Sequence, residues 1–291
     1  MAHQSEIVAF EPDIRAFKAL KTGPGLHYLN VALHDHRGTE SLNLTRKQDC
    51  SSLLRPNREL LDRFPDSGRF DIVGTQQIRV DTLDSQLTEV GMVDADLIKL
   101  DVQGSELAVL RGAQRTLADH VVGIETEVCF IPLYERQPLF SDVDAHLRAN
   151  GFEPFELAIE YWKEGLAPTV GSSRGRLAFA NALYLKSCEA TLEMIGRMEA
   201  GRRQSKLLRA LEVAHVYGHD DHGLRLVEEG RALLESPTFE AASRRLRRRV
   251  SLQRRIPDFP GRRAASSLIY QVYRVLRPRF WADYPTRYNR S

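Results

Sequence analysis

The stretch DADLIKLDVQGSELAVLRG, residues 94–112, decides the fold of this chain. It opens with a short, almost continuous apolar run, typical of a parallel strand covered by helices on both faces: Leu97, Ile98, Leu100 and Val102. A turn at Gly104 and an amphipathic helix follow. Ligands of open α/β sheets bind beyond the carboxyl ends of the strands, which would place Asp101 in a site. The alternative, which the spacing leaves open, is that Asp101 only caps the turn.

The rest of the chain alternates strand-like and helix-like segments, which predicts an α/β fold that finishes in an antiparallel pair. Beyond Lys186 the apolar spacing becomes helical, with a turn expected at 218–223. We therefore expect a domain at 1–187 and a helical, arginine-rich extension at 188–291. The expected elements are strands at 6–10, 27–33, 96–102 and 121–128, helices at 13–21, 82–90, 105–118 and 141–150, a hairpin-like pair near 39–45 and 70–80, and paired strands near 152–163 and 176–186.

Composition indicates a cytoplasmic protein with a sizeable core. The 291 residues are 42% hydrophobic, enough for one substantial domain and an appendage. No apolar run approaches the roughly 18 residues that span a bilayer, and the N-terminus does not resemble a signal peptide. Cys50, Cys129 and Cys188 are odd in number and lack metal-site spacing, which predicts reduced thiols.

Charge is distributed unevenly along the chain. Residues 241–291 carry 14 arginines and two aspartates, a net charge of +12, whereas the 27 basic and 37 acidic residues of 1–240 give −10. RRLRRRVSLQRR at 244–255 is a candidate for nucleic acid binding, and SSLIYQVYRVLRPRFW at 266–281 for an anionic membrane surface. Because the rest of the chain is acidic, docking within the chain or in a homo-oligomer is favoured over either external partner.

Several segments resemble the FkbM-type methyltransferases, S-adenosylmethionine-dependent enzymes with a Rossmann-like fold. The similarity extends over residues 6–187, and the matching segments follow one another in the family's order. They are IVAFEPD (7–13), YLNVALHDHRGTESL (28–42), CSSLL (50–54), VDTLDS (80–85), VVGIETEVCFIPLYERQPLF (121–140), HLRANGFEPFEL (146–157) and FANALYLK (179–186), together with the stretch at 94–112.

The resemblance lacks the part that opens the family's domain, a central strand followed by a glycine-rich turn under the methionine end of the cofactor. Six residues precede Ile7 of the first expected strand, fewer than the roughly 30 of a strand–helix–strand unit. We therefore expect an N-terminally incomplete sheet, in which the strands ending at Glu11 and Asp101 each have an unpaired edge. Either the chain is truncated or it is a remnant whose sheet is repaired differently.

The resemblance implies S-adenosylmethionine as cofactor and assigns residues to it. Glu11 would accept hydrogen bonds from the ribose diol, although a carboxylate there could instead interact with a helix dipole. Ala32 and Leu33 would flank the adenine, and both could equally be core residues. Asp101 would lie at both the cofactor and the transferred methyl group.

Methyl transfer to a hydroxyl requires alignment of the acceptor and removal of its proton. Asp101 is the first candidate, acting as the base or as a ligand of a divalent cation, which is possible but not expected. Glu127, at the end of the next strand, is the second candidate catalytic residue, and Glu106 is another possible partner. The alternative is that a glutamate of this strand, Glu125 or Glu127, pairs with a neighbouring cation such as Lys99.

These features predict an O-methyltransferase that acts on a hydroxyl of a sugar or small metabolite. The rival hypothesis is a non-catalytic remnant of the methyltransferase fold that serves as a binding or scaffolding module. Tyr134 and Gln137 resemble family positions near the acceptor pocket, whereas Ser51 and Ser52 are given no role. The polar group at 219–222 is interpreted as a solvated turn rather than a metal site.

Overall fold

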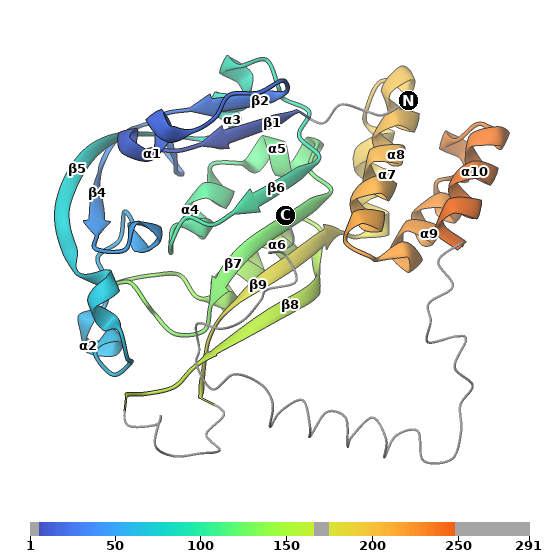
Figure 1. Cartoon of the computed structure of the whole chain (residues 1–291). Coiled ribbons are helices and arrows are strands. Elements are labelled where there is room, and N and C mark those ends of the chain that lie inside the picture. The colour runs from blue at the N-terminus through green and yellow to red at the C-terminus, as the bar shows by residue number, and fades with distance from the viewer. Residues whose placement is uncertain (1–5, 166–174, 248–291) are drawn as a thin grey trace, which may run out of the picture.

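The computed structural model describes residues 6–165 and 175–247 (Figure 1). It has the predicted α/β character, and its strands form three hydrogen-bonded groups. Two groups are the parallel pair β1 (Ile7–Phe10) and β2 (Leu26–Leu29), and β3 (Ala32–Leu33), β5 (Ile72–Asp81) and β4 (Gly38–Thr45) in that order. The third has the order β6 (Leu97–Leu100), β7 (Gly123–Cys129), β9 (Arg176–Lys186) and β8 (Phe152–Trp162). The expected antiparallel pairings of β4 with β5 and of β8 with β9 are confirmed.

The first and third groups share a core without sharing hydrogen bonds. Among the described strands β1 pairs with β2 alone and β6 with β7 alone, so each has an edge without a strand beside it. Val8 and Phe10 of β1 nevertheless pack on the apolar cluster that contains Ile98 and Leu100 of β6. The two unpaired edges expected from the sequence are therefore present.

The burial of β6 differs from its prediction. Ile98 and Leu100 are buried, but Leu97 is 40% exposed, so the expectation of a strand covered on both faces is wrong. Side chains alternate across a strand, and the face that carries Leu97 also carries Lys99 and Asp101. This polar face stays at the surface because the ammonium group of Lys99 is favoured near water.

The described helices cover the sheets and form the extension. Several boundaries differ from those expected, including those near Asn30, Gly112 and Asp220. Asn30 interrupts the strand expected at 27–33, and its side-chain amide donates to the carbonyl of Glu11. Gly112 ends the first half of the helix expected at 105–118, and the second of two helices near 218–223 begins at Asp220, inside the expected turn. The helices are α1 (Ile14–Ala19), α2 (Arg58–Leu61), α3 (Leu83–Glu89), α4 (Glu106–Arg111), α5 (Gln114–Asp119), α6 (Phe140–Ala149), α7 (Cys188–Gly196), α8 (Ala200–Val216), α9 (Asp220–Glu229) and α10 (Ser236–Arg247).

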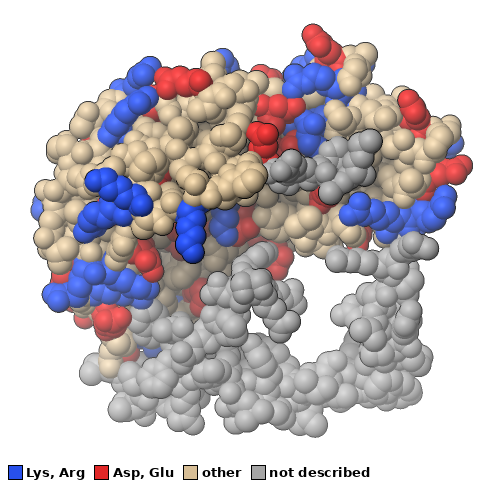
Figure 2. Space-filling view, turned by 45° about the horizontal axis from the view of Figure 1, so that its top comes forward, with Lys and Arg blue, Asp and Glu red and all other residues tan. Residues whose placement is uncertain are grey.

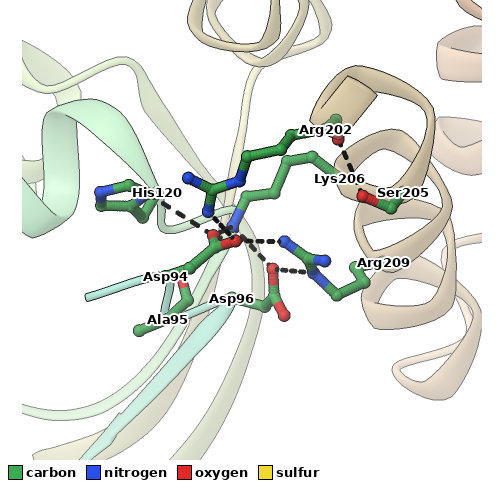
Figure 3. A network of polar contacts seen from close by, with 8 residues as sticks. All are labelled: Asp94, Ala95, Asp96, His120, Arg202, Ser205, Lys206 and Arg209. Atoms are coloured by element: carbon green, nitrogen blue, oxygen red, sulfur yellow. Dashed lines mark hydrogen bonds and ion pairs between the residues drawn. The ribbon is translucent and has the colours of Figure 1, made fainter. Parts of the chain in front are cut away.

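Helices α7 to α10 pack together beside the amino-terminal end of β6 (Figure 1). A network of charged side chains attaches α8 to the segment before β6 (Figure 3). Lys206, whose side chain is fully buried, lies 2.8 Å from a carboxylate oxygen of Asp94 and 2.6 Å from one of Asp96. Arg209 contacts the same two carboxylates, each at 2.8 Å. The acidic start of the fold-deciding stretch therefore anchors the extension.

The network also fixes the ionisation of Asp94. Contacts with His120, Lys206 and Arg202 hold the pKa of Asp94 well below its usual value, because each favours the charged carboxylate. Asp94 is therefore ionised at any pH at which the protein is studied.

The three cysteines are buried and free, as predicted. Within the described ranges, no helix has the length and apolar character needed to cross a membrane.

Candidate active site

Asp101 follows β6 directly and is exposed at its carboxyl end. The side-chain amide of Gln103 donates to Asp101 Oδ1 at 2.6 Å. The backbone here is left-handed, with φ of +52° at Gln103 and +100° at Gly104. A Cβ at residue 104 would lie 3.2 Å from Leu54 and Tyr134, so both conformation and space favour glycine. The turn thus presents Asp101 to solvent with a fixed partner.

Glu106 stabilises this turn through its backbone N–H groups. Its Oε1 accepts hydrogen bonds from the backbone N–H groups of Gly104 at 3.1 Å and Val102 at 3.3 Å. The side chain is buried at the start of α4, and burial raises its pKa to about 7. The negative charge of Asp101 contributes to the same increase. Glu106 therefore holds the turn with a carboxyl group that titrates near neutral pH.

Glu127 lies on β7, the strand beside β6. Its pKa is raised well above its usual value, first by burial and then by the charges of Asp101 and Glu106. The parallel register pairs Leu100 of β6 with Thr126 of β7, so Asp101 and Glu127 each follow a paired residue on neighbouring strands. The shift favours the protonated form of Glu127, in which its carboxyl group can donate a hydrogen bond.

Glu125, two residues earlier on the same face, has a structural role. One oxygen accepts from Lys99 Nζ at 2.8 Å and the other from the hydroxyl of Tyr217 in the extension, also at 2.8 Å. The pairing of one glutamate with Lys99, left open by the sequence, thus falls on Glu125 and not on Glu127.

Tyr134 connects the turn to the segment before α2. Its buried hydroxyl lies 2.9 Å from Gln103 Oε1 and 3.0 Å from the carbonyl of Cys50. Gln137 is also buried, and its side-chain carbonyl accepts from the backbone N–H of Tyr134. Ser52, to which the sequence assigned no role, donates to the carbonyl of Gln103 at 2.6 Å.

Gln103 is the residue that sequence reasoning missed. It joins Asp101 to Tyr134, yet its only signal in the sequence is a polar residue before the turn glycine. That signal is too common to indicate a role, because the left-handed backbone and the distant tyrosine become visible only in three dimensions.

Glu11 follows β1 and is partly buried, which raises its pKa. Its Oε1 accepts from the backbone N–H of Asp13 at 2.8 Å, just before α1. The structure therefore shows the helix-start interaction that the sequence offered as an alternative, and an assignment to the ribose remains a prediction.

Ala32 and Leu33 form β3 and pair in parallel with Val80 and Asp81 of β5. Leu33 is buried within the main apolar cluster, and Ala32 is partly buried. Both fit the core role that the sequence left open. Their contact with an adenine ring remains a prediction.

Glu11 and Asp101 follow β1 and β6, and among the described strands each of these two has one edge without a partner. Carboxylates at such strand ends are suited to a ribose diol and a sulfonium, and the binding of a nucleoside there remains a prediction. A small hollow beside Phe64, Phe70 and Trp162 is lined by none of these carboxylates.

Two other groups singled out in the sequence lie away from this edge. His219 and His222 pack edge-on against the ring of Phe155, and Asp220 contacts His215 at 2.6 Å. Residues 241–247 of the basic tail belong to α10 and include the first four residues of the candidate nucleic acid segment. The rest of that segment and the candidate membrane segment lie outside the described residues. Basic and acidic side chains are interspersed over the described face in Figure 2.

Comparisons with known proteins agree with the geometry. The family model described as "Methyltransferase FkbM domain" matches residues 1–154. The 2-O-methyltransferase NoeI of Sinorhizobium fredii (strain NBRC 101917 / NGR234) is 30% identical over 152 residues. That match covers 48% of this chain and 61% of the relative, so the chain spans less than two thirds of its length. No solved structure shows significant similarity. The chain belongs to the FkbM methyltransferase family.

Proposed function

We propose that this chain is an S-adenosylmethionine-dependent O-methyltransferase whose acceptor is a hydroxyl of a sugar or another small metabolite. The observation that carries the proposal is that Asp101 directly follows β6 while Glu127 lies in the adjacent parallel strand β7, one residue beyond the pairing of Leu100 with Thr126. Family membership and a relative named as a 2-O-methyltransferase support the reaction class.

Asp101 is the proposed general base. It is exposed and can accept the proton of an acceptor hydroxyl, while Gln103 fixes one of its oxygens at 2.6 Å. Tyr134 in turn contacts Gln103, so the orientation of Asp101 depends on the partly buried Gln103 and on the buried Tyr134 that contacts it. Preorganisation of this kind reduces the entropy lost when the acceptor is aligned.

Glu127 is the proposed partner on the neighbouring strand. Its raised pKa favours the protonated carboxyl group, which can donate a hydrogen bond to the acceptor without adding a second negative charge. Glu106 keeps the turn in place through the backbone N–H groups of Val102 and Gly104. No step in this proposal uses a metal ion.

Glu11 and Asp101 are proposed to hold the cofactor, with Ala32 and Leu33 beside its adenine. When bound, S-adenosylmethionine supplies an electrophilic methyl group on its sulfonium sulfur. For Glu11 to bind the ribose, its carboxylate must either keep the backbone N–H of Asp13 on Oε1 and use its other oxygen, or release that N–H.

Calorimetric titration of S-adenosylmethionine into the 291-residue chain tests the proposal, with circular dichroism as a folding check. Saturable binding that weakens in Glu11→Ala would support it. Asp101→Asn should keep the fold and, once an acceptor is found, lose turnover. A folded chain that does not bind the cofactor, or Asp101→Asn with the wild-type rate, would contradict the proposal.

One observation favours a second candidate, a methyltransferase fold that binds a partner without catalysis. Among the described strands, β1 and β6 each have one edge without a partner strand. Unpaired strand edges are also templates for pairing with another chain. Failure of the folded chain to bind S-adenosylmethionine would favour this candidate.

A further inference from the structure

The connection between β3 and β4 brings together three side chains that the proposed reaction does not use. His34, Asp35 and His36 follow Leu33, and one potential ligand atom of each lies within 4.8 Å of the other two. Asp35 Oδ1 is 2.7 Å from His34 Nδ1 and 2.9 Å from His36 Nδ1. Two imidazoles thus converge on one carboxylate oxygen.

These residue types are zinc ligands. Zinc takes imidazole nitrogen at about 2.0–2.1 Å and carboxylate oxygen at about 2.0–2.2 Å, and its tetrahedral geometry separates neighbouring ligand atoms by about 3.4 Å. The two N–O distances in this cluster are shorter by about half an ångström. A small rotation of the Asp35 side chain, which is 39% exposed, would open the cluster to this spacing.

The backbone that presents the cluster is held in place. The N–H of His34 donates to the carbonyl of Asp81 at 2.8 Å. On the opposite side, the carbonyl of His34 lies against Gly112, where a Cβ would come within 2.0 Å of it. The ligands therefore project from a segment fixed by β5 and by the end of α4, which limits the ordering cost of binding an ion.

A further carboxylate lies behind one imidazole. Glu40 Oε1 is 3.4 Å from Nε2 of His36, whose Nδ1 faces Asp35. Metal-bound histidines usually offer their second nitrogen to such a group, which fixes the tautomer and makes the ligand more basic. Glu40 therefore lies where it could accept a hydrogen bond from the second ring nitrogen of a metal-bound His36.

We propose that His34, Asp35 and His36 bind a divalent cation of the zinc class, with Glu40 positioning His36. Water would complete the coordination, since three protein ligands leave one position of a tetrahedral site open. The inference is independent of the proposed methyl transfer, because the side chains involved differ from the proposed catalytic and cofactor residues.

Titration of Zn²⁺ into the metal-free full chain by calorimetry tests the proposal. We expect one saturable site that is lost in His34→Ala and in His36→Ala and weakened in Asp35→Asn. Glu40→Gln should weaken binding about 10-fold, since loss of an outer-shell partner costs about 10- to 100-fold. His27→Ala is the matched control: it removes an imidazole of similar exposure on β2 and should leave the affinity unchanged.

Absorption of the Co²⁺-loaded chain provides a second readout. Nitrogen and oxygen ligands give visible bands without the near-ultraviolet band of a cobalt–thiolate bond. Absence of a saturable site in the folded wild type would overturn the proposal. Zn²⁺ affinity unchanged in both His34→Ala and His36→Ala, or a thiolate band that survives in them, would also overturn it.

Discussion

Replacement of Lys206 by methionine tests whether the charged network in Figure 3 holds the helical extension on the strand core. The ammonium group lies within 2.8 Å of both Asp94 and Asp96, and the side chain has no exposed surface. Methionine preserves much of the apolar packing of the stem but removes the charge. Two carboxylates would then lose the cation that they share.

The expected loss of stability follows from the burial of these groups. Removal of one partner from a buried ion pair costs about 3–5 kcal/mol. Asp94 and Asp96 are each 25% exposed and retain their contacts with Arg209, which reduces the cost to about 2 kcal/mol. For a domain of about 240 residues this corresponds to a melting temperature lower by about 4–8 °C.

Urea unfolding followed by circular dichroism measures the change in the free energy of unfolding. Arg244→Met is the matched control, because Arg244 is exposed and pairs with Glu240 one helical turn away, a contact worth about 0.5 kcal/mol or less. If Lys206→Met were no less stable than Arg244→Met, the network would not be what secures the extension.

Three further substitutions have defined outcomes. Because the pKa of Asp94 is lowered in the folded state, Asp94 stabilises the protein above its unfolded pKa of about 3.9, and this stabilisation is lost as the pH falls through the folded pKa. Asp94→Asn should therefore flatten the decline of the urea unfolding midpoint between about pH 5 and pH 3. The pKa of Glu127 is raised in the folded state, so Glu127 has the opposite effect: its contribution to stability is lost as the pH rises from about 4.3 toward the folded pKa. Glu127→Gln should therefore melt at a higher temperature than wild type at pH 8. A lower melting temperature would contradict the inference that burial disfavours the charged form of Glu127. Gly112→Ala should cost about 2–4 kcal/mol, because the new Cβ meets the His34 carbonyl at 2.0 Å and backbone must move, whereas a midpoint equal to wild type would refute that close approach.

The sequence predicted most of the elements because their signals are local. The alternation around β4 and β5 and the helical spacing beyond Lys186 depend on near neighbours, so both were identified correctly. The boundaries failed where a distant group intervenes. Gly112 ends α4 against the carbonyl of His34, and Asn30 interrupts a strand by bonding to Glu11.

The residues of the candidate site show the same difference between local signals and contacts with distant residues. That Asp101 and Glu127 belong to adjacent parallel strands could be predicted, and the register confirms it. The expectation that Glu127 ends its strand is wrong, because β7 continues to Cys129 and pairs with β9 there. Which of Glu125 and Glu127 is structural could not be predicted, since both face the same side and the choice depends on Tyr217, 92 residues after Glu125. Gln103 escaped notice for the same reason, as its partner Tyr134 is 31 residues away.

The α/β class, the family, the positions of Glu11 and Asp101 after strands, and the missing strand neighbours of β1 and β6 among the described strands could be predicted from the sequence, because these follow from local pattern and from the order of motifs. The tertiary structure sets which carboxyl groups are paired and which have a raised pKa. It also placed two imidazoles on the oxygen of Asp35. Burial and charge proximity are sums over residues distant in the chain, and the folded arrangement alone fixes them.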